Sequence, residues 1–143
     1  MRRIVLDASV VVKWFLIEED QETNIHNAQK ILHHIASSQI TIIQPTHWLP
    51  EVAAVLSRLR PQTAERDIFE LAEMNFKVCM HREALLHATH LAIDLKHHLF
   101  DTLYHAVALV IPDTNLVTAD QCYFHKARHK GSLVLLRDFS HHQ

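Results

Sequence analysis

The sequence predicts an α/β fold, a three-layer α/β/α sandwich with a mostly parallel central sheet. Two patterns support this prediction. Expected strands alternate with expected helices along the chain, and each strand is a continuous apolar run instead of an alternation of apolar and polar residues. Strands of that kind are buried on both faces, which is typical of parallel sheets with helices on each side. The length of 143 residues fits a single core, so we expect one domain over residues 1–143.

The first half of the chain supplies two expected strands. Residues 4–6 form a short apolar strand that Asp7 follows directly, and residues 40–43 form a second strand that Pro45 stops. Between these strands lie a short helix over residues 9–16 and an amphipathic helix with one apolar side, made of Ile25, Ala28, Leu32, Ile35 and Ala36.

A longer helix is expected after the second strand, with Thr46 as its N-cap and Leu59 near its end. Proline is not tolerated deep in a helix, so Pro50 favours a separate turn over residues 46–49 before the main helix. Glu51 then lies in the first turn of the main helix, where a negative charge also suits the helix dipole.

The second half continues the alternation of strands and helices. Strands are expected over residues 116–118 and 133–136, with a weaker candidate at 77–80. Residues 112–115 read as a turn. Asp101 opens a nearly all-apolar helix, and Asp120 is placed to cap another. The expected helices cover residues 62–74, 83–96, 103–111 and 121–128.

The composition excludes several classes of protein. The net charge of −2, with histidine neutral, gives no basic field, so a nucleic-acid role would need local basic patches or metal ions. P-loops and dinucleotide-binding fingerprints need glycines where the backbone approaches phosphate, and the chain has only 1 glycine, Gly131. We therefore exclude both kinds of nucleotide-binding loop.

The cysteines and the apolar segments predict a soluble, cytoplasmic protein with no membrane partner. Cys79 and Cys122 have no metal-binding spacing and read as ordinary thiols in a reducing compartment. Asp7 interrupts the first apolar run, so no secretory signal is expected. The longest apolar stretch, residues 8–17, contains Lys13 and is too short to span a bilayer.

Four acids stand at the ends of strands or the starts of helices, and we expect them to converge at one edge of the sheet. Close carboxylates repel one another unless a cation lies between them. Oxygen ligands select hard cations such as Mg²⁺ or Mn²⁺, which can activate water for attack on a phosphodiester. The candidate catalytic and metal-binding residues are Asp7, Glu51, Asp101 and Asp120.

Each acid also has a purely structural interpretation. Asp101 and Asp120 are each at a helix start, where aspartate is commonly a cap, and Glu51 alone suits a helix dipole. Asp7 is harder to explain in this way, because an acid that ends a buried strand needs a partner.

Four short motifs carry these acids, and in this order they resemble the successive motifs of PIN-domain ribonucleases. Within that family they look most like the VapC toxin of VapBC toxin–antitoxin modules. The resemblance spans nearly the whole chain, and the ordered set is more specific than any single motif. The motifs are Val5-Leu6-Asp7-Ala8-Ser9, Pro50-Glu51-Val52-Ala53, Phe100-Asp101-Thr102-Leu103-Tyr104 and Leu116-Val117-Thr118-Ala119-Asp120.

The resemblance implies a hydrolase, a Mg²⁺- or Mn²⁺-dependent ribonuclease with a PIN-like domain. It implies that the four acids form the catalytic quartet and that Ser9 and Thr118 are polar neighbours that position ligands or water. It also implies RNA as substrate, a cognate antitoxin whose tail covers the site, and a homodimer. The turn over residues 112–115 departs from the family pattern because it has no glycine.

Histidines offer a competing metal site. His87, His90 and Asp94 share one helix face and suit zinc or nickel, although a solvated face is the more ordinary interpretation. His105 follows Asp101 by one turn and suits a role beside the acids, an RNA contact or packing.

Two lysines are candidate RNA-binding residues. Lys13 and Lys126 each follow an acid of the quartet by two turns or fewer, so they can reach RNA phosphates near a metal, although ordinary solvated side chains explain them equally well. The alternative function is a non-catalytic PIN-like protein-binding module, which the near-neutral charge favours.

Overall fold

The computed structural model describes residues 2–16 and 22–140, and these residues form a five-stranded parallel sheet with helices on both faces. The predicted three-layer α/β/α architecture is therefore confirmed. The strand order is β3-β2-β1-β4-β5. The strands are β1 (Arg2–Leu6), β2 (Ile40–Pro45), β3 (Lys77–Cys79), β4 (Thr114–Thr118) and β5 (Leu133–Leu135).

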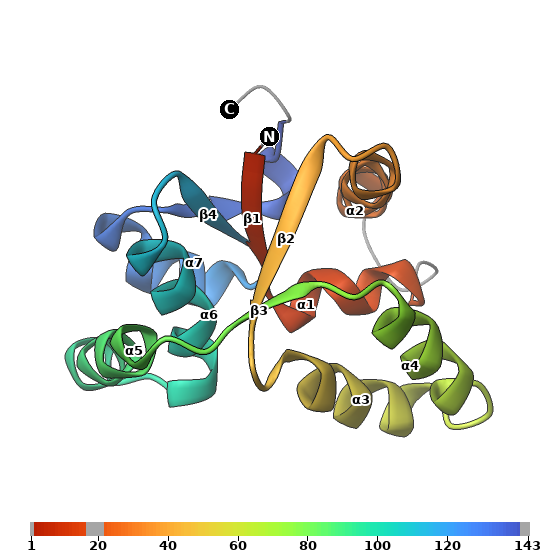
Figure 1. The fold of residues 1–143 in the computed structure, drawn as a ribbon, viewed down its shortest axis with the longest axis horizontal. Coiled ribbons are helices and arrows are strands. Elements are labelled where there is room, and N and C mark those ends of the chain that lie inside the picture. The colour runs from red at the N-terminus through yellow and green to blue at the C-terminus, as the bar shows by residue number, and fades with distance from the viewer. Residues whose placement is uncertain (1, 17–21, 141–143) are drawn as a thin grey trace.

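Helices cover the two faces of the sheet in chain order. Figure 1 shows α1, α2, α3 and α4 on one side and α5, α6 and α7 on the other. No helix in the described ranges combines the length and apolar character needed to cross a bilayer. The helices are α1 (Ala8–Val11), α2 (Glu22–Ala36), α3 (Trp48–Leu59), α4 (Ala64–Glu73), α5 (Arg82–Leu95), α6 (Leu99–Val110) and α7 (Gln121–Ala127), with short 3₁₀ turns η1 (Val12–Trp14), η3 (Arg128–Lys130) and η4 (Leu136–Asp138).

The central strand β1 lies at the point where the direction of winding reverses. The chain passes from β1 to β2 and β3 on one side, and then returns to place β4 and β5 on the other. Ile4, Val5 and Leu6 are fully buried, as a strand with helices on both faces requires. In open α/β sheets ligands bind at the carboxyl ends of strands at such a reversal, and Asp7 occupies that position here.

Backbone contacts fix Asp7 at the end of β1. Its N–H donates to the Val117 carbonyl of β4 at 3.1 Å. On the other side, the buried Gln44 amide bonds the backbone of Leu6, the residue before Asp7. The end of β1 is thus held by both neighbouring strands.

Several boundaries differ from those predicted. Helix α3 is continuous from Trp48, its N-cap is His47 instead of Thr46, and Pro50 lies in its first turn. Proline is tolerated there because the first N–H groups of a helix have no acceptor within the helix. Strand β4 begins at Thr114, so the turn after α6 is shorter than expected. Helix α6 begins at Leu99 and has Asp101 in its first turn.

Candidate metal centre

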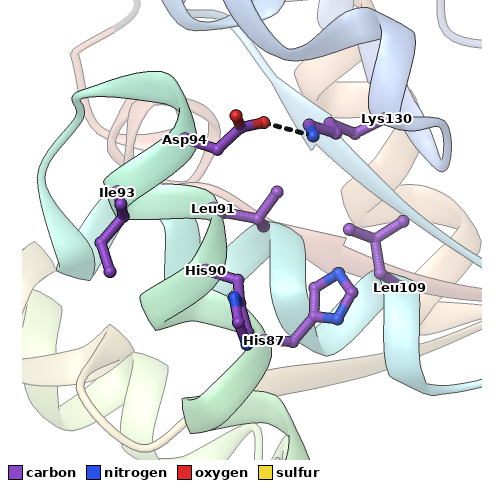
Figure 2. Close-up of a pocket in the computed structure, with 7 residues that line it drawn as sticks. All are labelled: His87, His90, Leu91, Ile93, Asp94, Leu109 and Lys130. Atoms are coloured by element: carbon purple, nitrogen blue, oxygen red, sulfur yellow. Dashed lines mark hydrogen bonds and ion pairs between the residues drawn. The ribbon is translucent and has the colours of Figure 1, made fainter.

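The histidine site proposed from the sequence is a pocket between α5, α6 and η3. Figure 2 shows that Lys130 reaches Asp94 across this pocket, with Nζ 2.5 Å from Oδ2. The pocket has a volume of about 640 Å³, and Leu91 and Leu109 contribute apolar walls. In the described part of the chain, the ligand atoms of His87, His90 and Asp94 do not gather within 4.8 Å of one another. The pocket is not a preformed three-ligand metal site.

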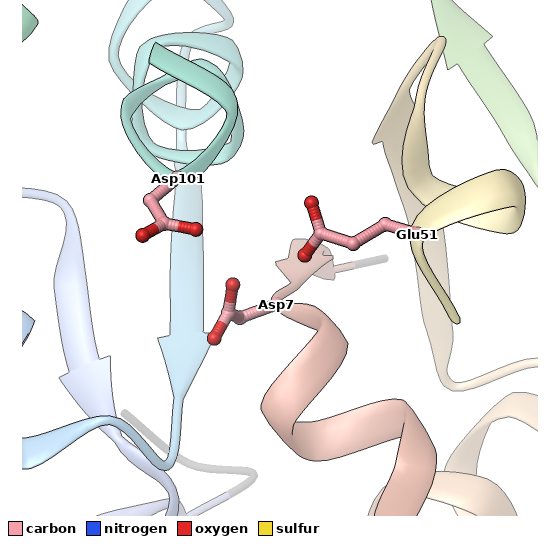
Figure 3. A group of neighbouring side chains, drawn as sticks. All are labelled: Asp7, Glu51 and Asp101. Atoms are coloured by element: carbon pink, nitrogen blue, oxygen red, sulfur yellow. The ribbon is translucent and has the colours of Figure 1, made fainter. Parts of the chain in front are cut away.

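Three of the four predicted acids do gather in this way. Asp7, Glu51 and Asp101 each offer a carboxylate oxygen, and these oxygens lie within 4.8 Å of one another. Figure 3 shows the three side chains approaching one another from the end of β1, from α3 and from α6. Asp7 is the N-cap of α1, and the other two acids lie in the first turns of their helices. The positive ends of α3 and α6 therefore reduce the cost of the cluster.

Two hydroxyl groups hold Asp7. Its Oδ2 accepts hydrogen bonds from Ser9 Oγ at 2.5 Å and from Thr118 Oγ1 at 3.1 Å. Ser9 Oγ also accepts the backbone N–H of Ala119 at 3.0 Å, which ties it to the end of β4. Both hydroxyl groups contact the same oxygen of Asp7, which leaves Oδ1 for a cation.

Burial, and to a smaller extent the neighbouring acids, disfavour the ionised form of Asp7. Burial raises the pKa of Asp7 to about 6, and the charges of Asp101 and Glu51 add to the rise, while the hydrogen bonds from Ser9 and Thr118 act against it. A bound divalent cation would reverse this balance, because it would stabilise the carboxylate directly.

Unpartnered polar atoms lie beside Glu51. His47 Nε2 is 3.3 Å from Glu51 Oε2, close enough for an ion pair but not aligned for a hydrogen bond. His47 also packs against Tyr104, with ring centroids 4.7 Å apart. The Tyr104 hydroxyl and both nitrogens of His47 are buried without a hydrogen-bond partner in the described residues. Buried polar groups are seldom left unpaired, so this side of the cluster is incomplete without a ligand or water.

The hydroxyl of Tyr104 faces the negative cluster. Burial, then the charges of Glu51, Asp7 and Asp101, and an interaction of the hydroxyl with the Glu51 side chain raise the pKa of Tyr104, although the hydroxyl makes no hydrogen bond of normal geometry to Glu51. The side chain itself is fully buried. The hydroxyl therefore keeps its proton and can donate it to a carboxylate or to a water molecule in the cluster.

Asp101 has a histidine partner that the sequence analysis did not assign. His97 Nε2 lies 2.9 Å from Asp101 Oδ2, and Lys126 Nζ lies 3.2 Å from His97 Nδ1. The contact repeats the spacing of His47 and Glu51, because in each pair the histidine precedes the acid by four residues. This spacing of four residues is visible in the sequence and could have indicated that His97 is a partner of Asp101.

Asp120 lies at the same edge of the sheet but outside the group of three. Its Oδ1 accepts the backbone N–H of Tyr123 at 3.0 Å, so it caps α7. Its own N–H donates to Thr118 Oγ1 at 3.0 Å, and the same hydroxyl donates to Asp7. Among the described residues, Asp120 thus makes the helix-cap contact and is connected to the cluster through the Thr118 hydroxyl.

The remaining candidates have different surroundings. His105 is fully buried, with Nδ1 2.9 Å from the Tyr123 hydroxyl and Nε2 2.7 Å from the Gly131 carbonyl. These contacts support the packing interpretation of His105. Lys13 lies in η1, just after α1, and Lys126 lies in the last turn of α7.

The oxygen-only ligand set suits a hard divalent cation. Hydrogen bonds occupy one oxygen each of Asp7 and Asp101, which favours ligation through the other oxygen alone. Ligation of this kind by a few carboxylates, with water completing the shell, is typical of Mg²⁺ and Mn²⁺ sites.

Comparisons with known proteins do not identify the chain. No model of a known protein family matches it, and no curated protein is similar enough to count as a match. The resemblance to PIN-domain motifs stays a prediction from the sequence, and function has to be inferred from the arrangement of the side chains.

Proposed function

We propose that this protein is a metal-dependent ribonuclease in which Asp7, Glu51 and Asp101 hold a Mg²⁺ or Mn²⁺ ion. The observation that carries the proposal is the approach of three carboxylate oxygens to within 4.8 Å of one another. The acids come from three segments far apart in the sequence, so local packing alone does not account for their meeting at the carboxyl edge of the sheet.

Two further features support a cation in this cluster. The pKa of Asp7 rises to about 6, so the metal-free cluster resists full ionisation. The buried hydroxyl of Tyr104 has no hydrogen-bond partner among the described residues, although it lies in the field of the acids. A hydrated ion would stabilise the ionised acids by offsetting their negative charge, and its water would accept a hydrogen bond from the Tyr104 hydroxyl.

The residues around the ion have separate tasks. When bound, a divalent ion supplies a more acidic water and positive charge for the scissile phosphate. Ser9 and Thr118 fix the orientation of Asp7 through its Oδ2. Tyr104 holds a proton that it can donate within the site. Attack of water on the phosphodiester, with the 3′-oxygen as leaving group, gives products with 5′-phosphate and 3′-hydroxyl ends.

RNA as substrate, and the partners, are supported by the resemblance of the ordered motifs to PIN-domain ribonucleases and VapC toxins. On that basis we propose a cytoplasmic toxin of a type II toxin–antitoxin pair, with a cognate antitoxin and a homodimeric assembly. The net charge of −2 means that phosphate binding depends on local cations. We propose Lys13 and Lys126 as two of them.

The test measures Mn²⁺ binding and RNA cleavage in the same preparations. Mn²⁺ at 100 times its Kd should stabilise the wild type by about 2.7 kcal/mol, which raises Tm by roughly 5–10 °C. A fluorescent single-stranded RNA should be cleaved with Mn²⁺ and left intact with chelator. Asp7→Asn should lose both responses.

Asp94→Asn is the matched control, because it removes an exposed carboxylate that pairs with Lys130 away from the cluster. It should keep both responses. Cleavage that persists in chelator, or that survives Asp7→Asn, would falsify the proposed function.

A non-catalytic protein-binding module is the second candidate. The low net charge favours it, and so do exposed apolar side chains at and just before the start of α5, Leu85 at 49%, Leu86 at 56% and Met80 at 81%. This candidate predicts no stabilisation by Mn²⁺ and no cleavage of any RNA, so the same titration separates the two.

A further inference from the structure

A chain of two contacts connects a lysine on the surface of α7 to one acid of the cluster. Lys126 Nζ lies 3.2 Å from His97 Nδ1, and His97 Nε2 lies 2.9 Å from Asp101 Oδ2. The three residues come from α7, from the connection between α5 and α6, and from the first turn of α6. The contacts therefore join two separate parts of the fold at the candidate metal centre.

The contact with Lys126 determines which nitrogen of the His97 ring carries the proton. An ammonium group has only protons to give, so Nδ1 of His97 must accept the hydrogen bond from Lys126. A neutral imidazole that accepts at Nδ1 carries its proton on Nε2. That proton points at Oδ2 of Asp101, which leaves Oδ1 of Asp101 for a cation.

The ring of His97 is held in place by its surroundings. Its side chain is only 13% exposed, and it packs edge-on against the ring of Tyr123 with centroids 4.9 Å apart. The hydroxyl of Tyr123 lies 2.9 Å from His105 Nδ1, which anchors that ring in turn. At the backbone, His97 N donates to Ala92 O at 3.1 Å, which closes the end of α5.

We propose that His97 and Lys126 are positioning residues for the metal ligand Asp101. His97 fixes the orientation of the Asp101 carboxylate, and Lys126 fixes the tautomer and orientation of His97. This inference rests on the proposed function, because it assigns a role within the same metal site. It also gives Lys126 a task in the absence of RNA, in addition to any contact with phosphate.

The experiment measures Mn²⁺ affinity by calorimetry on the full chain without RNA. His97→Leu should weaken Mn²⁺ binding by about 10- to 100-fold, the usual effect of losing a group that orients a metal ligand. His97→Gln should recover most of the affinity, because its amide can still donate to Asp101. Far-UV circular dichroism and metal-free unfolding curves show which variants fold.

Lys126→Met separates positioning from simple charge. Loss of a positive charge near the cluster should by itself tighten Mn²⁺ binding, whereas loss of the positioning contact should weaken it. Lys130→Met is the matched control, because it removes another lysine of the same segment whose ion pair is with Asp94. We expect weaker binding for Lys126→Met, by about threefold to tenfold, and a change of less than about twofold for Lys130→Met.

The outcomes keep the two proposals apart. If Asp7→Asn binds Mn²⁺ as the wild type does, the metal site is wrong and the positioning role with it. If Asp7→Asn loses Mn²⁺ while Lys126→Met and both His97 variants bind it as Lys130→Met does, the metal site stands and the positioning role is overturned. Lys126→Met keeps the inference testable even if His97→Leu does not fold, because Lys126 is exposed.

Discussion

The side-chain amide of Gln44 makes two hydrogen bonds to the backbone of Leu6 at the end of the central strand. Leu6 N donates to Gln44 Oε1 and Gln44 Nε2 donates to Leu6 O, each at 2.9 Å. The backbone pairing of β1 with β2 runs from Arg2 to Ile4, and the side-chain amide of Gln44 continues it at Leu6. Gln44 is fully buried. This amide holds the backbone immediately before Asp7.

Gln44→Leu should therefore be strongly destabilising. It leaves a buried N–H and a buried carbonyl of Leu6 without partners, and each such group costs about 1–3 kcal/mol. We expect a loss of about 2–4 kcal/mol in the free energy of unfolding, measured by urea denaturation. Gln62→Leu, at an exposed position, is the control and should change stability by less than about 0.5 kcal/mol. Equal effects of the two substitutions would show that the Gln44 contact does not hold the strand.

The metal-free protein should lose stability as the pH rises through the range where Asp7 ionises. The pKa of Asp7 is about 6 in the fold against an ordinary 3.8. Well below pH 3.8 the group is protonated in both states and costs nothing. Between pH 4 and 6 the unfolded chain releases its proton first, so unfolding becomes more favourable, and above pH 6 the penalty is constant at no more than about 3 kcal/mol.

Unfolding curves with chelator at pH 4 to 7.5 measure this effect. The wild type should lose stability across that window relative to Asp7→Asn, which cannot ionise there. Saturating Mn²⁺ should remove the difference in slope by stabilising the wild type only. If the stabilities of the two proteins with chelator change equally with pH, the pKa of Asp7 is not raised in the fold.

The sequence pattern predicted the alternation of strands and helices, and the parallel sheet that it implies predicted where residues after the strands would lie. Parallel strands place their carboxyl ends at one edge, so residues that follow the strands meet there whatever the details of packing. That rule places Asp7 directly after β1 and Glu51 in the helix that follows β2, whereas Asp101 reaches the same edge from the start of α6, a helix that follows α5 and not a strand.

Finer contacts depended on packing that the sequence pattern does not encode. His97 contacts Asp101 because the chain changes direction at Lys96, which ends α5 in a left-handed conformation. Lys126 contacts His97 from α7, an element far away in the sequence. The sequence allowed Asp120 to be either a metal ligand or a helix cap, and its cap contact with the N–H of Tyr123 depends on the side-chain conformation. Gln44 lies just beyond the strand predicted over residues 40–43, and the sequence pattern gave no sign that it bonds to Leu6.

Lys96 ends α5 in a conformation that suits glycine. Its φ is 52°, and it is one of several described residues other than glycine with positive φ. A side chain in the left-handed region is strained, so Lys96→Gly should stabilise the protein by about 0.5–1 kcal/mol. Lys30→Gly, in the middle of α2, is the control and should destabilise it by about 1 kcal/mol. Loss of stability in both variants would contradict the strain at Lys96.

Tyr104 and Tyr123 make a matched pair for testing the incomplete side of the cluster. Both are buried, but the hydroxyl of Tyr123 is bonded to His105 at 2.9 Å while that of Tyr104 has no partner in the described residues. With chelator present, Tyr123→Phe should cost about 1 kcal/mol. Tyr104→Phe should be neutral or stabilising by up to about 1 kcal/mol, because it removes a buried hydroxyl that makes no hydrogen bond of normal geometry among the described residues.

The Tyr104 hydroxyl should contribute to stability when Mn²⁺ is bound. If the hydroxyl finds its partner only when the cluster holds a hydrated ion, Tyr104→Phe should gain less stability from Mn²⁺ than the wild type does, whereas Tyr123→Phe should gain as much. Paired thermal unfolding curves with chelator and with Mn²⁺ measure the difference. A loss of more than about 1 kcal/mol in metal-free Tyr104→Phe would mean that the hydroxyl is already bonded and that the cluster is complete without an ion.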